Sequence, residues 1–198
     1  RILKSIEYSV WLKILQDSGF ASINHSGGTL FDHLVGTYEL LTLCKAPLFV
    51  CAAGLFHTIY GTQSNNVKEP PNSTLRSAMI GIISYEAEHL TWLFSIMKKA
   101  DYYQNLLNNE RLPTNIVSRF DHSTIALNAE MQLGMPLLLA ANWVEVMPRS
   151  IELRSINNVA PLLHIANHLD AIAALGIVGA INKWSKEQTV EVIYDERY

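Results

Sequence analysis

Two histidines stand where a buried helix would otherwise carry apolar side chains. His33 lies in the segment HSGGTLFDHL, and His57 lies in AGLFHTIYGT. A buried imidazole must satisfy both of its ring nitrogens, and a metal ion, a carboxylate or a bound ligand can each supply a partner. The two segments therefore predict a functional site built on these histidines.

Hydrophobic spacing predicts the elements that carry the two histidines. Apolar residues recur at helical intervals over 29–44 and 47–60, and the sequence Lys-Ala-Pro at 45–47 joins the two stretches. Pro47 suits the first turn of a helix. A turn this short makes the helices antiparallel neighbours, so we expect His33 and His57 to approach each other.

These segments resemble the HD-domain superfamily of metal-dependent phosphohydrolases, and more closely its RelA/SpoT-like branch. Residues 28–33 resemble the Gly-x-Pro-Tyr-x-x-His segment of that branch, and residues 53–58 resemble its Ala-x-Leu-His-Asp segment. The likeness covers about residues 22–147. It implies an all-α, single-domain, HD-like helical bundle over 1–198, with residues 159–198 as a C-terminal extension.

The family's metal ligands carry over only in part. His33 and His57 match its histidines, but Thr58 stands where the family has aspartate, and the last aspartate ligand falls on Asn142 or Asn167. Asn142 is preferred, because its interval from His57 is closer to the family's. Neutral hydroxyl and amide groups hold divalent cations more weakly than carboxylates. The resemblance thus implies an offshoot of the superfamily in which His33 and His57 bind Mn, Fe or Zn weakly or not at all.

Further polar residues are candidates for the same pocket. Glu145 lies one helical turn beyond Asn142 and joins His33, His57, Thr58 and Asn142 in the candidate catalytic set. The candidate ligand-binding residues are His25, Asp32, Tyr60, Thr62 and Arg119. The polar connection 61–72 is predicted to be a mobile lid over the pocket.

Several candidates have a purely structural alternative. Asp32 is suited to cap its helix, the Thr58 hydroxyl to bond the carbonyl of Gly54, and Arg119 to pair with a surface glutamate. His164 and His168 have the i, i+4 spacing of a metal-binding pair, but the sequence fixes no third ligand for them.

The remaining elements are also predicted to be helical. The expected helices cover residues 2–17, 73–81, 84–99, 101–109, 123–146 and 159–183. Gly176 and Gly179 are expected to permit close approach of a neighbouring element, and the tail TVEVIYDERY alternates like a strand.

The composition and charge of the chain limit the kinds of molecule that it is expected to bind. A chain of 198 residues that is 49% hydrophobic and 17% charged is long enough to bury a large core. A net charge of −3 with scattered Lys and Arg excludes a basic nucleic-acid face, and no apolar run reaches the roughly 18 residues of a membrane span. Cys44 and Cys51 fit buried positions better than a disulfide. We expect a cytoplasmic protein that takes a small-molecule substrate or ligand, with a homodimer as an option.

Three function classes follow. The favoured class is a small-molecule hydrolase or lyase acting on a phosphorylated or other polar metabolite, with His33 and His57 as weak metal ligands or as acid and base. The alternatives are a non-catalytic ligand-binding or scaffold protein and an HD-like iron oxygenase.

Overall fold

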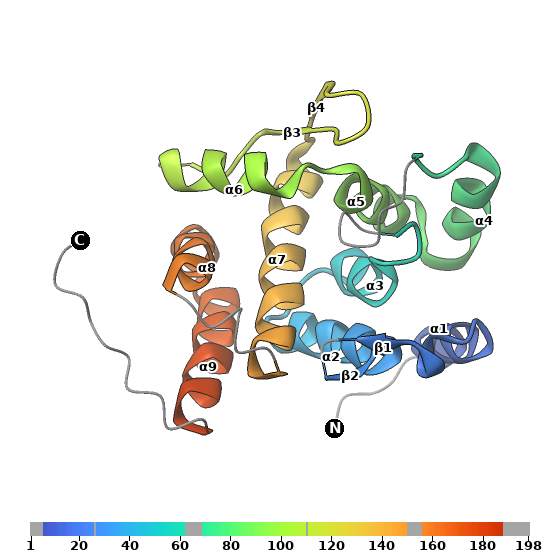
Figure 1. Ribbon diagram of the computed structural model, residues 1–198, viewed down its shortest axis with the longest axis horizontal. Coiled ribbons are helices and arrows are strands. Elements are labelled where there is room, and N and C mark those ends of the chain that lie inside the picture. The colour runs from blue at the N-terminus through green and yellow to red at the C-terminus, as the bar shows by residue number, and fades with distance from the viewer. Residues whose placement is uncertain (1–5, 26, 62–68, 110, 150–155, 188–198) are drawn as a thin grey trace, which may run out of the picture.

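The chain forms a bundle of α-helices with two small hairpins (Figure 1), as seen in a computed structural model that describes residues 6–25, 27–61, 69–109, 111–149 and 156–187. The all-α prediction is confirmed. In the described residues the helices are α1 (Ile6–Asp17), α2 (Leu30–Leu43), α3 (Leu48–Phe56), α4 (Ser73–Ile83), α5 (Tyr85–Ile96), α6 (Lys99–Asn108), α7 (Ala129–Val146), α8 (Ile156–His168) and α9 (Ala171–Glu187). The hairpins pair β1 (Asn24–His25) with β2 (Gly28–Thr29), and β3 (Asn115–Val117) with β4 (Thr124–Ala126).

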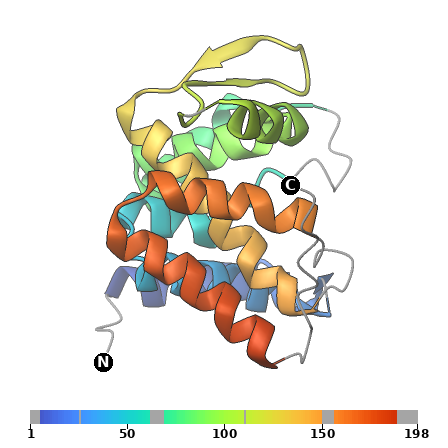
Figure 2. The ribbon, with the colours of Figure 1, turned by 90° about the vertical axis from the view of Figure 1, so that its left-hand side faces the viewer.

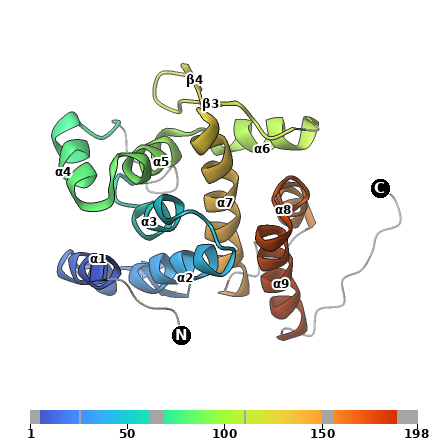
Figure 3. The same ribbon diagram turned by 180° about the vertical axis from the view of Figure 1, so that it is seen from behind.

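Helix α7 runs through the middle of the molecule and organises the rest. Helices α2, α3 and α5 pack on one side of it, and α8 and α9 pack on the other (Figure 1 and, from behind, Figure 3). In the side view of Figure 2, α8 and α9 lie across α7. The face of α7 that carries Asn142 and Glu145 is therefore directed at α2.

Helix α3 is the most buried element, with every residue from Val50 to Phe56 in the interior. It packs between α2, α5 and α7. The start of α2 lies beside the end of α3, as the prediction of antiparallel neighbours requires, and the turn between the helices places Lys45 at a φ of 53°. His33 and His57 thereby meet.

Helix α3 ends four residues earlier than the hydrophobic spacing predicts. The His57 ring donates a hydrogen bond from Nδ1 to the carbonyl of Gly54 at 2.7 Å. In a continuing helix this carbonyl would accept from the backbone N–H of residue 58. The chain proceeds instead in tight turns, with Ile59 N–H bonded to the Phe56 carbonyl and Gly61 N–H bonded to the Thr58 carbonyl.

Two further predicted helices are wrong in extent. Residues 124–126 form β4 instead of the first turn of a helix over 123–146, because they pair in register with β3, and α7 begins only after the cap of Asn128. The predicted helix 159–183 is two helices, since the Asp170 carboxylate accepts from the backbone N–H groups of Ile172 and Ala173 and starts α9. The strand-like tail lies outside the described residues.

Of the two glycines in α9, only Gly176 has the predicted close contact with a neighbouring element. A Cβ on Gly176 would lie 2.6 Å from the sulfur of Cys44, whereas a Cβ on Gly179 would meet nothing within 4 Å. Cys44 and Cys51 are buried free thiols, as predicted. No helix in the described ranges is long and apolar enough to cross a membrane.

The packing of α3 against α2 predicts the effect of a single methyl group. A Cβ on Gly54 would lie 2.4 Å from Cδ1 of Leu41, so Gly54→Ala should reduce the free energy of unfolding by about 1–3 kcal/mol, the usual cost of overpacking. Gly81 in α4 has open space around it, and Gly81→Ala should instead stabilise the protein by up to about 1 kcal/mol. Urea unfolding of both variants tests this, and equal effects at the two sites would contradict the close contact.

Candidate functional site

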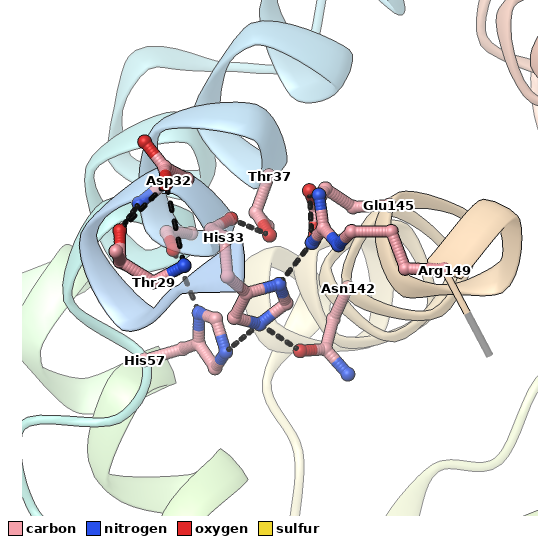
Figure 4. A network of polar contacts seen from close by, with 9 residues as sticks. Thr29, Asp32, His33, Thr37, His57, Asn142, Glu145 and Arg149 are labelled. Atoms are coloured by element: carbon pink, nitrogen blue, oxygen red, sulfur yellow. Dashed lines mark hydrogen bonds and ion pairs between the residues drawn. The ribbon is translucent and has the colours of Figure 1, made fainter. Parts of the chain in front are cut away.

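His33 is the centre of a buried polar network (Figure 4). The residue is 1% exposed, and its ring uses both nitrogens. Nδ1 contacts the carboxylate of Glu145, while Nε2 lies 3.0 Å from Oδ1 of Asn142 and 3.2 Å from Nε2 of His57. Asn142 and Glu145 of α7 and His57 at the end of α3 thus surround one imidazole of α2, although they are 24 to 112 residues away from it in sequence. The preference for Asn142 over Asn167 agrees with this arrangement.

His57 is held in one orientation. It is also 1% exposed, its Nδ1 donates to the Gly54 carbonyl, and its ring meets the ring of Phe94 edge to face at a centroid distance of 5.3 Å. A carbonyl oxygen only accepts hydrogen bonds, so the Nδ1 atom of His57 carries a proton. When the ring is neutral, its Nε2 atom presents a lone pair to His33.

Glu145 is the buried carboxylate of the site. Its side chain is 8% exposed and bridges His33 and the guanidinium of Arg149, which follows one helical turn later. Gly36 makes room for it, since a Cβ at that position would lie 2.8 Å from Cγ of Glu145. A glycine inside a helix costs about 1 kcal/mol relative to alanine, and here it allows a charged group to reach the backbone of α2.

The protonation of the His33 ring follows from these partners. Because Glu145 also accepts from Arg149, its carboxylate acts as an acceptor and His33 Nδ1 acts as the donor. With Nδ1 protonated, a neutral His33 would direct the lone pair of Nε2 at the Asn142 oxygen and at the lone pair of His57. Three acceptor atoms would then converge with nothing between them. A proton or a metal cation at that point removes the repulsion.

His25 connects the buried pair with the surface. Its ring packs on the His33 ring at a centroid distance of 4.6 Å. It also lines a hollow of about 370 Å³ formed with Asn24, Gly27, Gly28 and Thr29 of the first hairpin. Burial and the neighbouring His33 lower the pKa of His25. His25 is therefore the candidate ligand-binding residue that the structure brings to the site.

Burial also controls the protonation of His57. Its pKa lies well below the ordinary value of 6.5, chiefly because burial removes the ring from water and also because His33 is close to it. Lys99 adds to this effect; its ammonium lies 4.4 Å above the Phe94 ring, and burial lowers the Lys99 pKa to about 8. His57 is thus neutral at pH 7 and available as a base or as a ligand.

The structure gives four other candidates different partners. Asp32 is exposed and forms a capping box with Thr29, so it acts as the helix cap and not as a pocket carboxylate. The Tyr60 hydroxyl donates to the buried Glu88, and the Arg119 side chain donates to the Ser95 carbonyl. The Thr58 hydroxyl is buried without a partner in the described structure, so it does not form the alternative bond to the Gly54 carbonyl, which accepts from His57.

The remaining candidates lie away from the pair or outside the described residues. Thr62 and most of the predicted lid, residues 62–68, lie outside them. Asn167 is exposed on α8, and the rings of His164 and His168 pack on each other at 4.6 Å in the same helix. Within the described ranges, no group of three or more His, Cys, Asp or Glu residues is arranged to hold a metal ion.

Sequence reasoning missed two residues that hold Glu145 in place. Arg149 had a signal, because Glu-x-x-x-Arg on a helix is an ion-pair spacing. Gly36 had a weaker one, since an isolated glycine within a helical pattern often has a packing reason. Neither signal identifies His33 as the group that shares the carboxylate, because that contact joins positions 112 residues apart.

Comparison with known proteins gives a match to a family model. Residues 14–99 are similar to a family described as Domain of unknown function (DUF6817). This segment contains His33 and His57 and stops before Asn142 and Glu145. No curated protein and no solved structure matches the chain significantly.

The lowered pKa of His57 predicts a dependence of stability on pH. The unfolded chain binds a proton near pH 6.5 that the folded His57 does not bind, so stability is lost as the pH falls below that value. Each such histidine contributes a slope of about 1.4 kcal/mol per pH unit. His57→Gln should remove one proton's worth of this slope between pH 6.5 and 5.

Urea unfolding at several pH values measures the slope directly. The control is His122→Asn, because His122 is exposed and its φ of 60° suits asparagine. An unchanged slope in His57→Gln would show that the folded protein protonates His57 as readily as the unfolded chain.

Proposed function

We propose that this protein is a small-molecule hydrolase or lyase that acts on a phosphorylated or other polar metabolite at the His33–His57 pair. The observation that carries the proposal is the position of the two Nε2 atoms. They face each other at 3.2 Å inside the protein, while each Nδ1 is anchored by a separate acceptor. Such anchoring of one ring nitrogen leaves the other for a proton or a metal.

As an acid–base centre, the pair works with Glu145. A proton on His33 Nε2 lies between the Asn142 oxygen and the His57 lone pair, and the Glu145 carboxylate compensates the positive charge. When that proton has left, the Nε2 lone pair of His57, neutral because it is buried, is free to accept a proton from water or substrate. The Asn142 amide orients the group that reacts.

As a metal centre, the two Nε2 atoms have a suitable spacing, but the ligand set would bind a cation weakly. Two nitrogens bound to one ion at about 2.1 Å in tetrahedral geometry lie roughly 3.4 Å apart, close to the 3.2 Å between the two imidazoles. Glu145 and the Gly54 carbonyl would orient the rings from behind. The third donor is a neutral amide, and the HD aspartate is Thr58. Mn, Fe or Zn would therefore be held weakly.

A substrate can approach through the hollow beside His25. A volume of about 370 Å³ is at the lower end of the range for ligand pockets. The Arg149 side chain lies next to Gly27 and Gly28 at this hairpin, so a cation stands close to the opening. This supports a substrate with an anionic group, as in a phosphorylated metabolite.

The second candidate, a scaffold or ligand-binding protein, is supported by the hydrogen-bond partners of the two imidazole rings. Both imidazoles are 1% exposed, and every one of their nitrogens has a partner. A network of that kind can serve packing alone. An iron oxygenase is less well supported, since the described residues place no third histidine or carboxylate on the Nε2 side. The buried free thiols support a reducing compartment such as the cytoplasm.

Metal content is the first test. Protein purified without a histidine tag or chelator should contain a divalent metal well below one equivalent, and dialysis should remove it. Asn142→Asp, which supplies a carboxylate at the same position, should raise the affinity by about 10-fold or more. Stoichiometric metal that survives chelator in the unaltered protein would contradict the expected weakness.

Turnover separates the enzyme from the scaffold. The assay follows phosphate release and product masses with a panel of nucleotides, sugar phosphates and other phosphate esters. His57→Gln should lose about 100-fold or more in turnover with a nearly unchanged melting temperature, because it removes proton transfer but keeps one hydrogen-bonding end.

The matched control is His168→Gln, a partly buried histidine in α8. It should leave turnover unchanged. A loss of about 1–3 kcal/mol of stability in both His33→Gln and His57→Gln, with no turnover in the unaltered protein, would favour the scaffold.

A further inference from the structure

Helix α8 carries a second pair of histidines, on the side of α7 opposite to α2 and α3 (Figure 1). His164 and His168 are one helical turn apart, and their ring centroids are 4.6 Å apart with the planes inclined by 36°. The Nε2 atom of His164 is buried and has no hydrogen-bond partner in the described structure. A buried nitrogen without a partner is costly, so this atom points to a ligand that would supply the contact.

The hydrogen bonds of the two rings fix the positions of their lone pairs. His168 Nδ1 lies 2.9 Å from the carbonyl oxygen of His164, and because a carbonyl only accepts, this Nδ1 carries a proton. The backbone of Asn109 bonds to the His164 ring and raises its pKa, as an accepting carbonyl does. Since His164 Nε2 has no such partner, Nδ1 makes this bond and carries the proton. In each neutral ring the lone pair is therefore on Nε2.

We propose that His164 and His168 together bind one divalent transition-metal cation, such as Zn²⁺ or Cu²⁺, through their Nε2 atoms. Two imidazoles that hold one ion at about 2.1 Å in tetrahedral geometry have ring centres roughly 5 Å apart, close to the 4.6 Å between these rings. The Nδ1 atom of each ring donates to a backbone carbonyl, which is the contact that commonly orients a metal-binding histidine.

The number of ligands sets the expected affinity and selectivity. Among the residues that the structure describes, no group of three or more His, Cys, Asp or Glu is arranged to hold a metal ion. The two imidazoles therefore share the cation with water, and binding is weaker than at a structural zinc site with four protein ligands. Imidazole nitrogen favours Cu²⁺, Ni²⁺ and Zn²⁺, whereas Mg²⁺ prefers oxygen. A chelator should remove the cation readily.

The α8 pair is more accessible than the pair at the candidate site. His168 is partly exposed, whereas His33 and His57 are each 1% exposed. A cation from solvent can thus reach the α8 pair from the His168 side. Burial, chiefly, and the neighbouring His168 also lower the pKa of His164, so that this ring is neutral at pH 7, as metal binding requires.

A bound cation would strengthen the contact between α6 and α8. Asn109, whose backbone bonds the His164 ring, directly follows the last residue of α6. A metal on Nε2 withdraws electron density from the imidazole and makes Nδ1–H a stronger donor to this carbonyl. Because the unfolded chain does not hold the two rings in place, the cation binds the folded protein preferentially and stabilises it by mass action.

Titration of chelator-treated protein with ZnCl₂ tests the site. The ring nitrogens of each histidine are observed separately by ¹H–¹⁵N NMR, so the two histidine pairs report independently. Zn²⁺ should shift the Nε2 signals of His164 and His168 together, with saturation at one equivalent for this pair, and MgCl₂ should not shift them. Zn²⁺ should also raise the melting temperature. A titration in which neither α8 ring responds to Zn²⁺ would overturn the proposal.

Substitution of one ligand at a time locates the cation. His164→Gln and His168→Gln each keep much of the side-chain volume but remove an imidazole ligand, and each should weaken Zn²⁺ binding on α8 by about 10-fold or more. The matched control is His57→Gln, which changes the other pair and should leave the α8 titration unaltered. The melting temperature without metal shows that each variant is folded. Unchanged Zn²⁺ affinity in folded His164→Gln and His168→Gln would contradict the assignment.

The outcome is independent of turnover. The α8 pair is not part of the proposed reaction, so His168→Gln should lose the α8 cation and keep the turnover of the unaltered protein. Absence of turnover in the unaltered protein would count against the proposed function and leave the Zn²⁺ titration valid. Loss of the α8 response in His57→Gln, with full binding in His164→Gln, would assign the cation to the other pair and overturn this proposal alone.

Discussion

The structure depends on the electrostatics of two imidazoles that are enclosed in the protein with their Nε2 atoms 3.2 Å apart. With both Nδ1 atoms committed as donors, the facing atoms are acceptors unless a proton or a metal lies between them. In the low-dielectric interior, a buried polar group without a hydrogen-bond partner is costly, whereas a network in which every group has a partner is stable. The surrounding residues are explained by this requirement: Glu145 accepts from His33 Nδ1, and Asn142 supplies an oxygen beside His33 Nε2.

The bundle is arranged so that the requirement can be met. Helix α7 faces α2 with Asn142 and Glu145, and Gly36 leaves space for the carboxylate against the α2 backbone. The end of α3 is altered by the same site, since His57 takes the carbonyl that would continue the helix. Packing and polar contacts thus act together, and a change such as an added methyl at Gly36 would reach the His33 ring through one carboxylate.

The two hollows give the buried pair two different neighbours. One lies beside His25 and the glycines of the first hairpin, and the other is lined by residues of α2, by Lys45 and by Glu145. This separation is compatible with histidines that are themselves almost completely closed to solvent.

The sequence by itself determined the helical class, the antiparallel pair of helices and the meeting of His33 with His57, because these follow from local periodicity and a short turn. It also selected Asn142 and Glu145 as residues on one helical face. The local sequence pattern predicted the wrong secondary structure for residues 124–126, because their pairing with β3 makes them a strand. Tertiary structure alone decided that Glu145 binds His33 Nδ1, that Tyr60 bonds Glu88 and that Asp32 caps its helix on the surface. The physical reason is that periodicity fixes which face a side chain occupies, whereas its hydrogen-bond partner depends on which other helix is packed against that face.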